Sequence, residues 1–292
     1  MRTGGIGTRT ARKAHGTRSV GCVGPRYLGA SVLTVFLVTT LLLGGCAGDT
    51  GAKEKLVEGY KLLESPRPDY AQMSAAADAY LSAEPNGPGA AEALYLRGRA
   101  FEEKSHQDVT SPEQDLTRAH TAYTQALTLK PRPGVEGLIR AGLGNVFYFQ
   151  NKYPQAIAEL SAGYDKLERN GDKAWALYRV GLCQQRVGQW EQADRTFAKV
   201  GQQFPGTEQA RRAAEHTGQR AFWVQVGTYG AAAQADAVVA EMKKMGLTAG
   251  KYTDATRPGV QLVRVGPLTT YDAAVGVKNR VWGRYTTAII VP

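Results

Sequence analysis

Two short runs of alternating residues near the C-terminus carry side chains suited to ligand binding. Residues 222–229 read Phe-Trp-Val-Gln-Val-Gly-Thr-Tyr, and residues 262–268 read Leu-Val-Arg-Val-Gly-Pro-Leu. Successive side chains of a β-strand point to opposite faces, so the valines share one face and Trp223, Gln225 and Arg264 share the other. Leu262 falls on the same face as Arg264. An aromatic ring, an amide and a guanidinium together suit a polar ligand that contains rings.

Each run must be positioned by the helix that follows it. Both runs break at a glycine, Gly227 in the first and Gly266 in the second, and lead into an alanine-rich amphipathic stretch. When the two glycines are superposed, Ala235 falls on Ala274. The pattern predicts a strand–helix–strand unit written twice, with both helices against the valine face of one four-stranded sheet. No further element is available to cover the other face.

Two motifs and the helix between them carry a family resemblance. They are Val224-Gln225-Val226-Gly227 with Tyr229, the helix expected at 231–246, and Val263-Arg264-Val265-Gly266-Pro267. In this order they resemble the SPOR (sporulation-related repeat) domain of bacterial envelope proteins, which usually carries Tyr-Arg where this chain has Gln261-Leu262. The resemblance implies a ferredoxin-like or RRM-like βαββαβ domain that binds peptidoglycan glycan strands stripped of their stem peptides, as found at division septa.

The uncovered sheet face is expected to hold the glycan. From Arg220 onward the chain has nine Lys or Arg residues and four Asp or Glu residues, a net charge of about +5. When an amidase removes the stem peptide, the lactyl group of N-acetylmuramic acid becomes a free carboxylate, which an arginine can bind. The predicted glycan-binding residues are Trp223, Gln225, Leu262, Arg264 and, from the second strand, Tyr252. The alternatives are that Arg264 is a solvated strand residue and that Trp223 is an aromatic covering the sheet edge.

RNA binding is the alternative function that an RRM-like topology raises. RRM sheets stack bases on aromatic side chains of their two central strands. Here those strands offer Trp223, but then Gln225, Leu262 and Arg264. An exported protein would rarely meet RNA, so we expect no nucleic-acid partner.

The N-terminus has the composition of an export signal. Residues 1–45 contain six Lys or Arg residues and no Asp or Glu, and an apolar run lies within 32–43. Leu43-Gly44-Gly45-Cys46 resembles the lipobox of bacterial lipoproteins, which implies a signal peptide at 1–45, acylation of Cys46 and a short linker at 46–52. Ala47 after the cysteine favours the outer membrane, with the protein facing the periplasm. The alternative is an uncleaved transmembrane anchor.

The middle of the chain, residues 53–218, contains a repeated pattern in which an alanine is followed four residues later by an aromatic residue or leucine. The pairs are Ala76/Tyr80, Ala119/Tyr123, Ala156/Leu160 and Ala193/Phe197. Gly144 and Gly181 stand twelve residues before the last two alanines. The pattern resembles the tetratricopeptide repeat, which implies antiparallel helix pairs whose small residues let two backbones approach while the large residue fills the gap.

Stacked repeats form a concave surface lined by their first helices, which implies a groove for a protein partner. The groove positions of the family correspond here to Tyr95, Arg99, Asn145, Tyr148, Tyr178, Gln185 and Arg186. We expect the tyrosines to be exposed, because exposed tyrosines next to Arg and Asn are typical of contact surfaces. The alternative is that these residues merely cover a scaffold.

No combination of residues in the sequence predicts catalysis, a metal site or a cofactor. The histidines outside the export segment are far apart and are expected to face solvent: His106, His120 and His216. No glycine-rich phosphate loop precedes a helix. Cys183 lies in a helical pattern and is expected to pack in a core, while Glu102 and Glu103 are expected to be solvated.

The chain is therefore predicted to be mainly α, with a tetratricopeptide-like helical hairpin array at 53–218 and an α+β SPOR domain at 219–292. The predicted function is that of a non-enzymatic outer-membrane lipoprotein that binds glycan strands and scaffolds a protein partner in cell division or envelope remodelling. The alternative is an outer-membrane assembly lipoprotein whose C-terminal domain is only a weak wall anchor.

Overall fold

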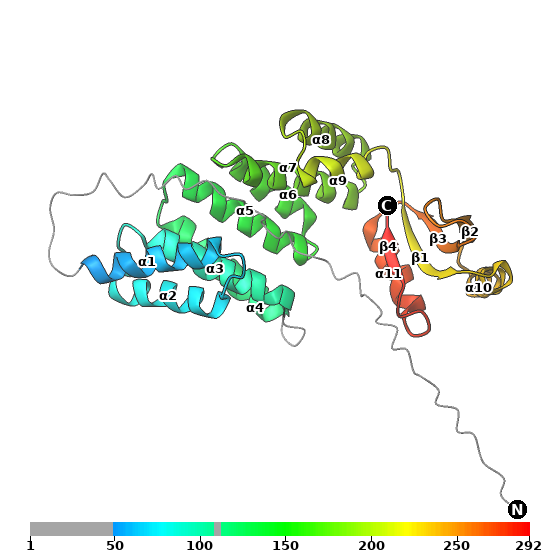
Figure 1. Ribbon diagram of the computed structural model, residues 1–292, viewed down its shortest axis with the longest axis horizontal. Helices are drawn as coiled ribbons and strands as arrows, with labels where there is room; N and C mark the ends of the chain where they lie inside the picture. The colour runs from blue at the N-terminus through cyan, green and yellow to red at the C-terminus, as the bar shows by residue number, and fades with distance from the viewer. Residues whose placement is uncertain (1–48, 108–111) are drawn as a thin grey trace, which may run out of the picture. The chain divides into compact units, whose positions relative to one another are not determined.

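The computed structural model describes residues 49–107 and 112–292 (Figure 1). The predicted signal peptide, the predicted lipidation site at Cys46 and the first part of the predicted linker lie outside these residues. No helix in the two described ranges is long and apolar enough to cross a membrane.

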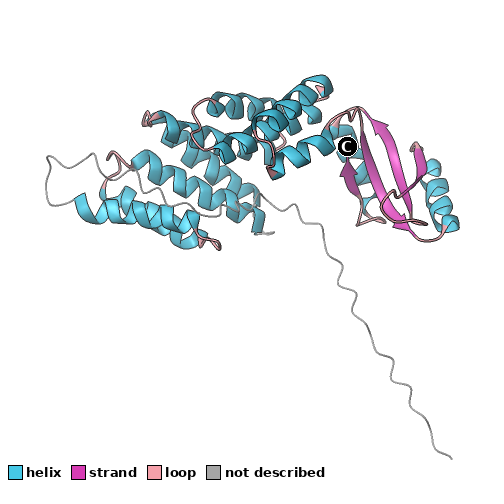
Figure 2. Ribbon diagram, turned by 45° about the horizontal axis from the view of Figure 1, so that its top comes forward, coloured by secondary structure: helices cyan, strands magenta, loops and turns pink. Residues whose placement is uncertain are grey.

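Helices fill the first part of the described chain, and neighbours in sequence pack against one another (Figures 1 and 2). They are α1 (Asp49–Glu64), α2 (Tyr70–Ala83), α3 (Ala90–Gln107), α4 (Pro112–Thr128), α5 (Pro133–Phe149), α6 (Tyr153–Tyr164), α7 (Asn170–Arg186), α8 (Trp190–Gln203) and α9 (Glu208–His216). Short connections make successive helices antiparallel neighbours. The predicted array of helical hairpins is thereby confirmed.

The predicted use of small residues at helix crossings is also confirmed. A Cβ atom added to Gly98 of α3 would lie 2.5 Å from the Tyr123 ring of α4, and one added to Gly181 of α7 would lie 2.4 Å from the Phe197 ring of α8. Both distances are far below van der Waals contact. The absence of a side chain on the first helix of each pair therefore makes room for the aromatic ring of the second.

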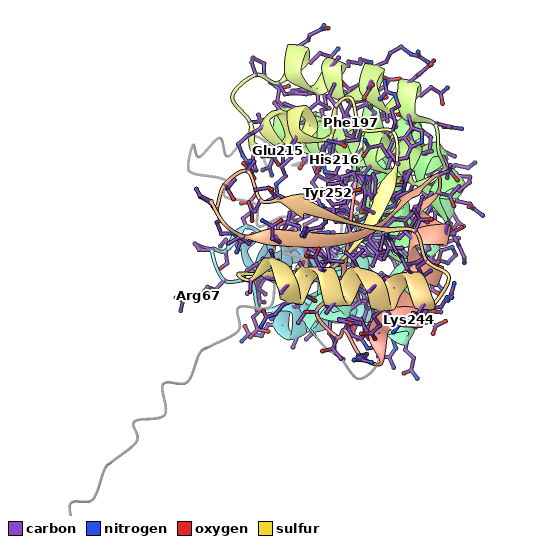
Figure 3. All side chains as sticks on the ribbon, turned by 90° about the vertical axis from the view of Figure 1, so that its right-hand side faces the viewer. Arg67, Phe197, Glu215, His216, Lys244 and Tyr252 are labelled. Carbon is purple, nitrogen blue, oxygen red and sulfur yellow. The ribbon has the colours of Figure 1, made fainter. Side chains whose placement is uncertain are left out.

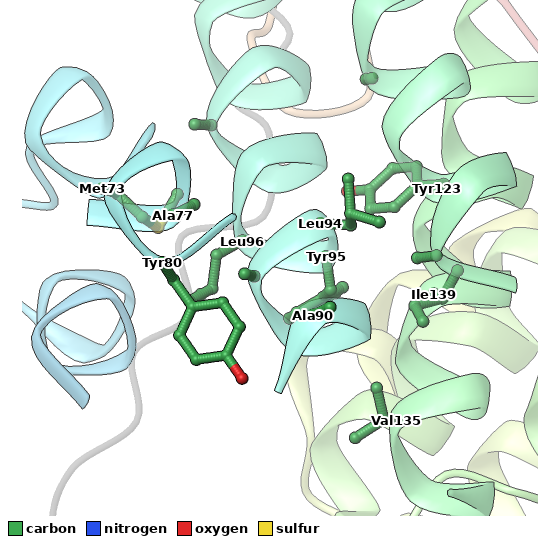
Figure 4. Close-up of a cluster of buried hydrophobic side chains, with 14 of the residues drawn as sticks. Met73, Ala77, Tyr80, Ala90, Leu94, Tyr95, Leu96, Tyr123, Val135 and Ile139 are labelled. Atoms are coloured by element: carbon green, nitrogen blue, oxygen red, sulfur yellow. The ribbon is translucent and has the colours of Figure 1, made fainter. Parts of the chain in front are cut away.

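The large residues of the repeated pattern form the cores between the helices. Figure 4 shows one such core, in which Met73 and Tyr80 of α2 lie beside Leu96 of α3, and Tyr123 packs against the other side of α3. All four side chains are fully or almost fully buried. Burial of apolar side chains of this size is the main source of stability for a helix array.

Two glutamates on α3 are not the solvated residues that the sequence predicts. Glu102 has no exposed surface, because it lies where α3, α4 and α5 meet. Its carboxylate accepts hydrogen bonds from Arg99, from the hydroxyl of Tyr123 and from the side-chain amide of Asn145. Glu103 is half-buried and pairs with the same Arg99 at 2.7 Å. The expectation of solvation was therefore wrong for both residues.

The histidine expectation was also wrong, whereas the cysteine expectation is confirmed. His120 and His216 are half-buried against the rings of Phe147 and Phe197, at centroid distances of 5.4 and 5.6 Å; the side chain of His106 is outside the described ones. Cys183 packs in the core between α5, α6 and α7. Burial raises the pKa of its thiol to about 12, so it carries no reactive thiolate at neutral pH.

The C-terminal part is a four-stranded antiparallel sheet with two helices. Its elements are β1 (Phe222–Tyr229), α10 (Ala232–Lys244), β2 (Ala249–Thr253), β3 (Gln261–Leu268), α11 (Tyr271–Trp282) and β4 (Ile289–Val291), with strand order β2-β3-β1-β4. Figure 2 shows the four strands as one sheet. Ala235 of α10 and Ala274 of α11 are fully buried in one core with the four valines of the repeated motif. The predicted βαββαβ domain is confirmed.

Candidate functional site

The sheet face opposite the two helices brings the predicted ligand-binding residues together. Gln225 of β1 lies directly across from Arg264 of β3 in the strand register. The Arg264 Nε donates a hydrogen bond to the Gln225 Oε1 at 3.3 Å. Both side chains are half-buried, which leaves part of each accessible from solvent. Gln225 thus orients the guanidinium while the remaining nitrogens of Arg264 stay available.

Trp223 and Tyr252 form the aromatic part of this face. Their ring centroids are 5.5 Å apart in an edge-to-face arrangement, although the residues come from strands that are not neighbours. The Arg264 guanidinium carbon lies 5.9 Å from the centroid of the Tyr252 ring. Tyr252 is 39 % exposed, and Figure 3 shows it on the side of the sheet opposite α10, which ends at Lys244.

Two glycines make this ring contact across the sheet possible. A Cβ atom on Gly266 of β3 would lie 2.8 Å from the Trp223 indole, and Gly266 also has φ +146°, a conformation that side chains disfavour. A Cβ atom on Gly250 of β2 would lie 3.0 Å from the Tyr252 hydroxyl. Each ring therefore lies over a glycine, in space that the Cβ atom of any other residue would occupy. The two rings give this face of the sheet an aromatic surface.

Leu262 lies on this face as predicted, but it contributes little accessible surface. It is paired with Tyr252 in the strand register and only 7 % exposed. A direct contact between Leu262 and a ligand stays a prediction.

The fourth strand adds two residues that the sequence did not indicate. Ile289 pairs with Gln225, and Val291 pairs with Trp223, so both side chains lie on the face of the predicted site. Ile289 is 44 % exposed, which is unusual for an isoleucine in a sheet. The run Ala-Ile-Ile-Val at 288–291 is apolar throughout. Since it has no alternation, nothing in the sequence could have told which of its residues face the site.

Arg264 differs in its charge pairing from four other cations of this domain, Arg220, Lys251, Arg257 and Arg284, each of which pairs with a carboxylate. Lys251 pairs with Asp236 at 2.6 Å on the helix-covered side, and Arg257 pairs with Asp254 at 2.6 Å. Hydrogen bonds from Thr256 and Arg257 lower the pKa of Asp254 to about 2, so this carboxylate stays ionised and keeps its partner. Within the described residues, Arg264 has no carboxylate partner. It is therefore a cation ready to bind an anionic group.

The predicted groove residues of the helical array are less exposed than expected. Tyr95, Arg99, Asn145, Tyr148 and Gln185 are all buried, while Tyr178 and Arg186 are half-buried. The expectation of exposed tyrosines was therefore wrong for two of the three. The physical reason is that the first helices pack closely enough to enclose these side chains between successive repeats.

The structure joins the groove residues into two clusters. Arg99 and Asn145 meet through Glu102, as described above. Farther along the array, the guanidinium carbon of Arg186 lies 4.3 Å from the centroid of the Tyr148 ring. Sequence patterns did not indicate Arg179, whose guanidinium carbon lies 4.1 Å from the same ring. Arg179 lies one helical turn before Cys183 on α7. Its contact with Tyr148 results from the packing of α7 against α5, which the sequence pattern does not show. Whether these clusters contact a partner stays a prediction.

Comparisons with known proteins find two family matches within the chain. Residues 218–292 match the SPOR domain family, and residues 175–207 match the tetratricopeptide repeat family. Two solved structures of MamA, an ArsTM double mutant of MamA RS-1 and a MamA fragment from residue 41 to the end from Desulfovibrio magneticus RS-1, are each 21 % identical to this chain. Each match covers 58 % of this chain and 92 % or 93 % of the other, with a TM-score of 0.43. No curated protein matches the chain.

Proposed function

We propose that this chain, in which a SPOR domain follows a tetratricopeptide array, holds a protein partner at the bacterial cell wall by binding glycan strands stripped of their stem peptides. SPOR domains bind peptidoglycan and tetratricopeptide repeats bind proteins, and neither is a catalytic family. The glycan part of the proposal rests on the position and the unpaired charge of Arg264. This arginine has no carboxylate partner in the described chain, and it lies beside Gln225 and two aromatic rings on a sheet face without covering helices.

The proposed site distinguishes stripped glycan from intact glycan by charge. In intact glycan the lactyl group ends in a neutral amide, whereas in stripped glycan it ends in a carboxylate. Arg264 donates charge-assisted hydrogen bonds to that carboxylate, and Gln225 pairs with N-acetyl or hydroxyl groups. Trp223 and Tyr252 stack on the sugar faces. One charge-assisted contact contributes about 1.5–3 kcal/mol, which corresponds to a preference of about tenfold or more.

The proposal also places the chain in the cell envelope. The basic and apolar N-terminus followed by Leu43-Gly44-Gly45-Cys46 supports export and acylation of Cys46. Acylation would tether the protein to a membrane, which we propose to be the outer membrane, and the SPOR domain would link that membrane to the wall. A preference for stripped glycan then directs the protein to sites of division or wall remodelling, where amidases remove stem peptides.

Substitution of Arg264 tests the glycan site. In Arg264→Ala, affinity for amidase-treated sacculi should fall about tenfold, and the loss of affinity with rising salt should become shallower because a screened charge contact is gone. Affinity for untreated sacculi should change little. The measurement is a sacculus pull-down of wild type and variant over a range of salt concentrations.

Lys251→Ala is the matched control for this experiment. It removes the same charge from the neighbouring strand, but Lys251 lies on the helix-covered side and pairs with Asp236. The control should bind treated sacculi as wild type does. Equal losses in Arg264→Ala and Lys251→Ala would show that net charge alone, not the proposed site, governs binding.

A further inference from the structure

Two arginines of α7 contact the same tyrosine ring, and neither has a carboxylate partner among the described residues. The guanidinium carbons of Arg179 and Arg186 lie 4.1 and 4.3 Å from the centroid of the same ring, that of Tyr148 on α5. Arg186 also lies 4.1 Å from the centroid of the Tyr271 ring. We call these four residues, Arg179, Tyr148, Arg186 and Tyr271, the arginine–tyrosine cluster.

The hydrogen bonds of the cluster leave both charges unneutralised. Arg179 is 8 % exposed, and its Nε is buried without a hydrogen-bond partner. Arg186 donates one hydrogen bond, to the Tyr153 hydroxyl at 2.9 Å, which is a neutral acceptor. Neither arginine forms an ion pair with any carboxylate in the described ranges. In the described part of the chain, the two guanidinium groups therefore face aromatic rings and one hydroxyl group, and no anion.

Other arginines of the array show that this arrangement is not the rule. Arg99 pairs with two glutamates, and Arg140 of α5 pairs with Glu136 and Glu159. The array as a whole is neutral, with 21 Lys or Arg and 21 Asp or Glu residues in 53–218. The lack of carboxylates beside Arg179 and Arg186 in the described structure is thus a local feature. It does not result from an excess of basic residues in the array.

Electrostatics indicates what would bind there. Removing an arginine from water is costly unless an anion compensates, and cation–π contacts compensate only in part. The rings lie close to both guanidinium groups, and a carboxylate could accept the N–H groups that have no other acceptor, since it accepts two parallel N–H groups from an arginine. Because α5 and α7 are the first helices of their repeats, the cluster lies on the side that stacked repeats use for partners.

We propose that the arginine–tyrosine cluster binds a carboxylate of an acidic peptide segment in the protein partner. This inference rests on the proposed function of the array as a partner-binding scaffold, and it specifies the chemistry of that partner. Arg179 and Arg186 supply the charge, and Tyr148 fixes the separation between them. A neutral segment of the same length would leave both charges uncompensated and would bind weakly.

A peptide titration tests the inference. The full chain, purified in detergent, is titrated against fluorescein-labelled hexaglutamate, with hexaglutamine as the neutral probe, and binding is followed by fluorescence anisotropy. Hexaglutamate should bind at least tenfold more tightly than hexaglutamine, and its affinity should fall as salt rises. Arg179→Gln and Arg186→Gln should each weaken hexaglutamate binding about tenfold.

Arg140→Gln is the control, because it removes the same charge from an arginine that already has two carboxylate partners. It should change the affinity less than twofold. Circular dichroism checks that each variant is folded. If Arg179→Gln does not fold, Arg186→Gln alone decides the test, because Arg186 is only half-buried. Equal binding of the two probes by wild type, or unchanged hexaglutamate binding in the folded cluster variants, would overturn the inference.

Sacculus binding separates this inference from the proposed function. Both cluster variants should bind amidase-treated sacculi as wild type does, because the open sheet face is untouched. Loss of the hexaglutamate preference with sacculus binding intact would remove the acidic-peptide inference alone. Failure of wild type to bind sacculi would instead contradict the proposed glycan function.

Discussion

Glu102→Ala should destabilise the helical array by about 3–5 kcal/mol, the usual cost of removing one partner from a buried charge pair. Glu102 has no exposed surface. Its carboxylate accepts a hydrogen bond from the Arg99 guanidinium at 2.8 Å and one from the Tyr123 hydroxyl at 2.6 Å. It also accepts from Asn145, which comes from a third helix. The substitution leaves these donors buried with fewer acceptors, and it opens a cavity where three helices meet.

Urea unfolding followed by circular dichroism measures this effect, and Glu103→Ala is its matched control. Glu103 is adjacent in sequence and pairs with the same Arg99 at 2.7 Å, but its side chain is 15 % exposed and makes no contact with α4 or α5 among the bonds found in the described chain. The control should cost clearly less than Glu102→Ala, because Arg99 keeps Glu102 as its partner and no second buried donor loses its acceptor. Similar unfolding midpoints for the two variants would show that Glu102 is not the centre of the network.

Gly137→Ala should destabilise the array by about 1–3 kcal/mol, the typical cost of overpacking a closely packed core. A Cβ atom on Gly137 of α5 would lie 2.8 Å from the backbone nitrogen of Leu167 and 2.8 Å from the carbonyl carbon of Lys166. Backbone atoms cannot move aside as the end of a side chain can. The gain of about 1 kcal/mol that alanine brings in a helix is therefore outweighed.

Gly201→Ala is the control for the glycine experiment, because a Cβ atom there would meet nothing within 4 Å. Gly201 lies on α8 and is exposed, so alanine should leave stability unchanged or raise it by up to about 1 kcal/mol. Thermal and urea unfolding of both variants give the comparison. A Gly137→Ala variant as stable as wild type would mean that α5 and the segment before α7 can separate at little cost.

Alternation along the two motif strands was enough to predict one half of the candidate site. Period-2 geometry placed Trp223, Gln225 and Arg264 on one face, and the structure brings them together there. The superposition of Gly227 on Gly266 likewise predicted both helices on the opposite face. These predictions succeeded because each depends on a pattern within a few residues of the chain.

The remainder of the site depends on contacts between strands distant in sequence. Trp223 reaches Tyr252 only because Gly266 and Gly250 leave space beneath the rings, and the strand register decides this. The face of Ile289 is likewise fixed by its pairing with Gln225. A sequence pattern records the order of residues on a strand, but it does not record which residues of the neighbouring strand lie opposite.

Glu102 shows the same limit in the helical array. Two adjacent glutamates on a helix are usually solvated, and the sequence around Glu102 gives no other indication. Its burial results from the packing of α4 and α5, whose Asn145 donates from 43 residues farther along the chain. The groove tyrosines were misjudged for the same reason, because the tightness of the stack determines their exposure.

The central claim, that the open sheet face binds stripped glycan, is tested most directly by nuclear magnetic resonance. The ¹⁵N-labelled chain is titrated with glycan strands freed of their stem peptides, and the side-chain signals of Trp223, Gln225 and Arg264 are followed. Our account predicts that these three signals shift together and saturate, while signals from α10 and from Lys251 stay in place. Shifts confined to the helix-covered side, or no shifts at millimolar glycan, would contradict it.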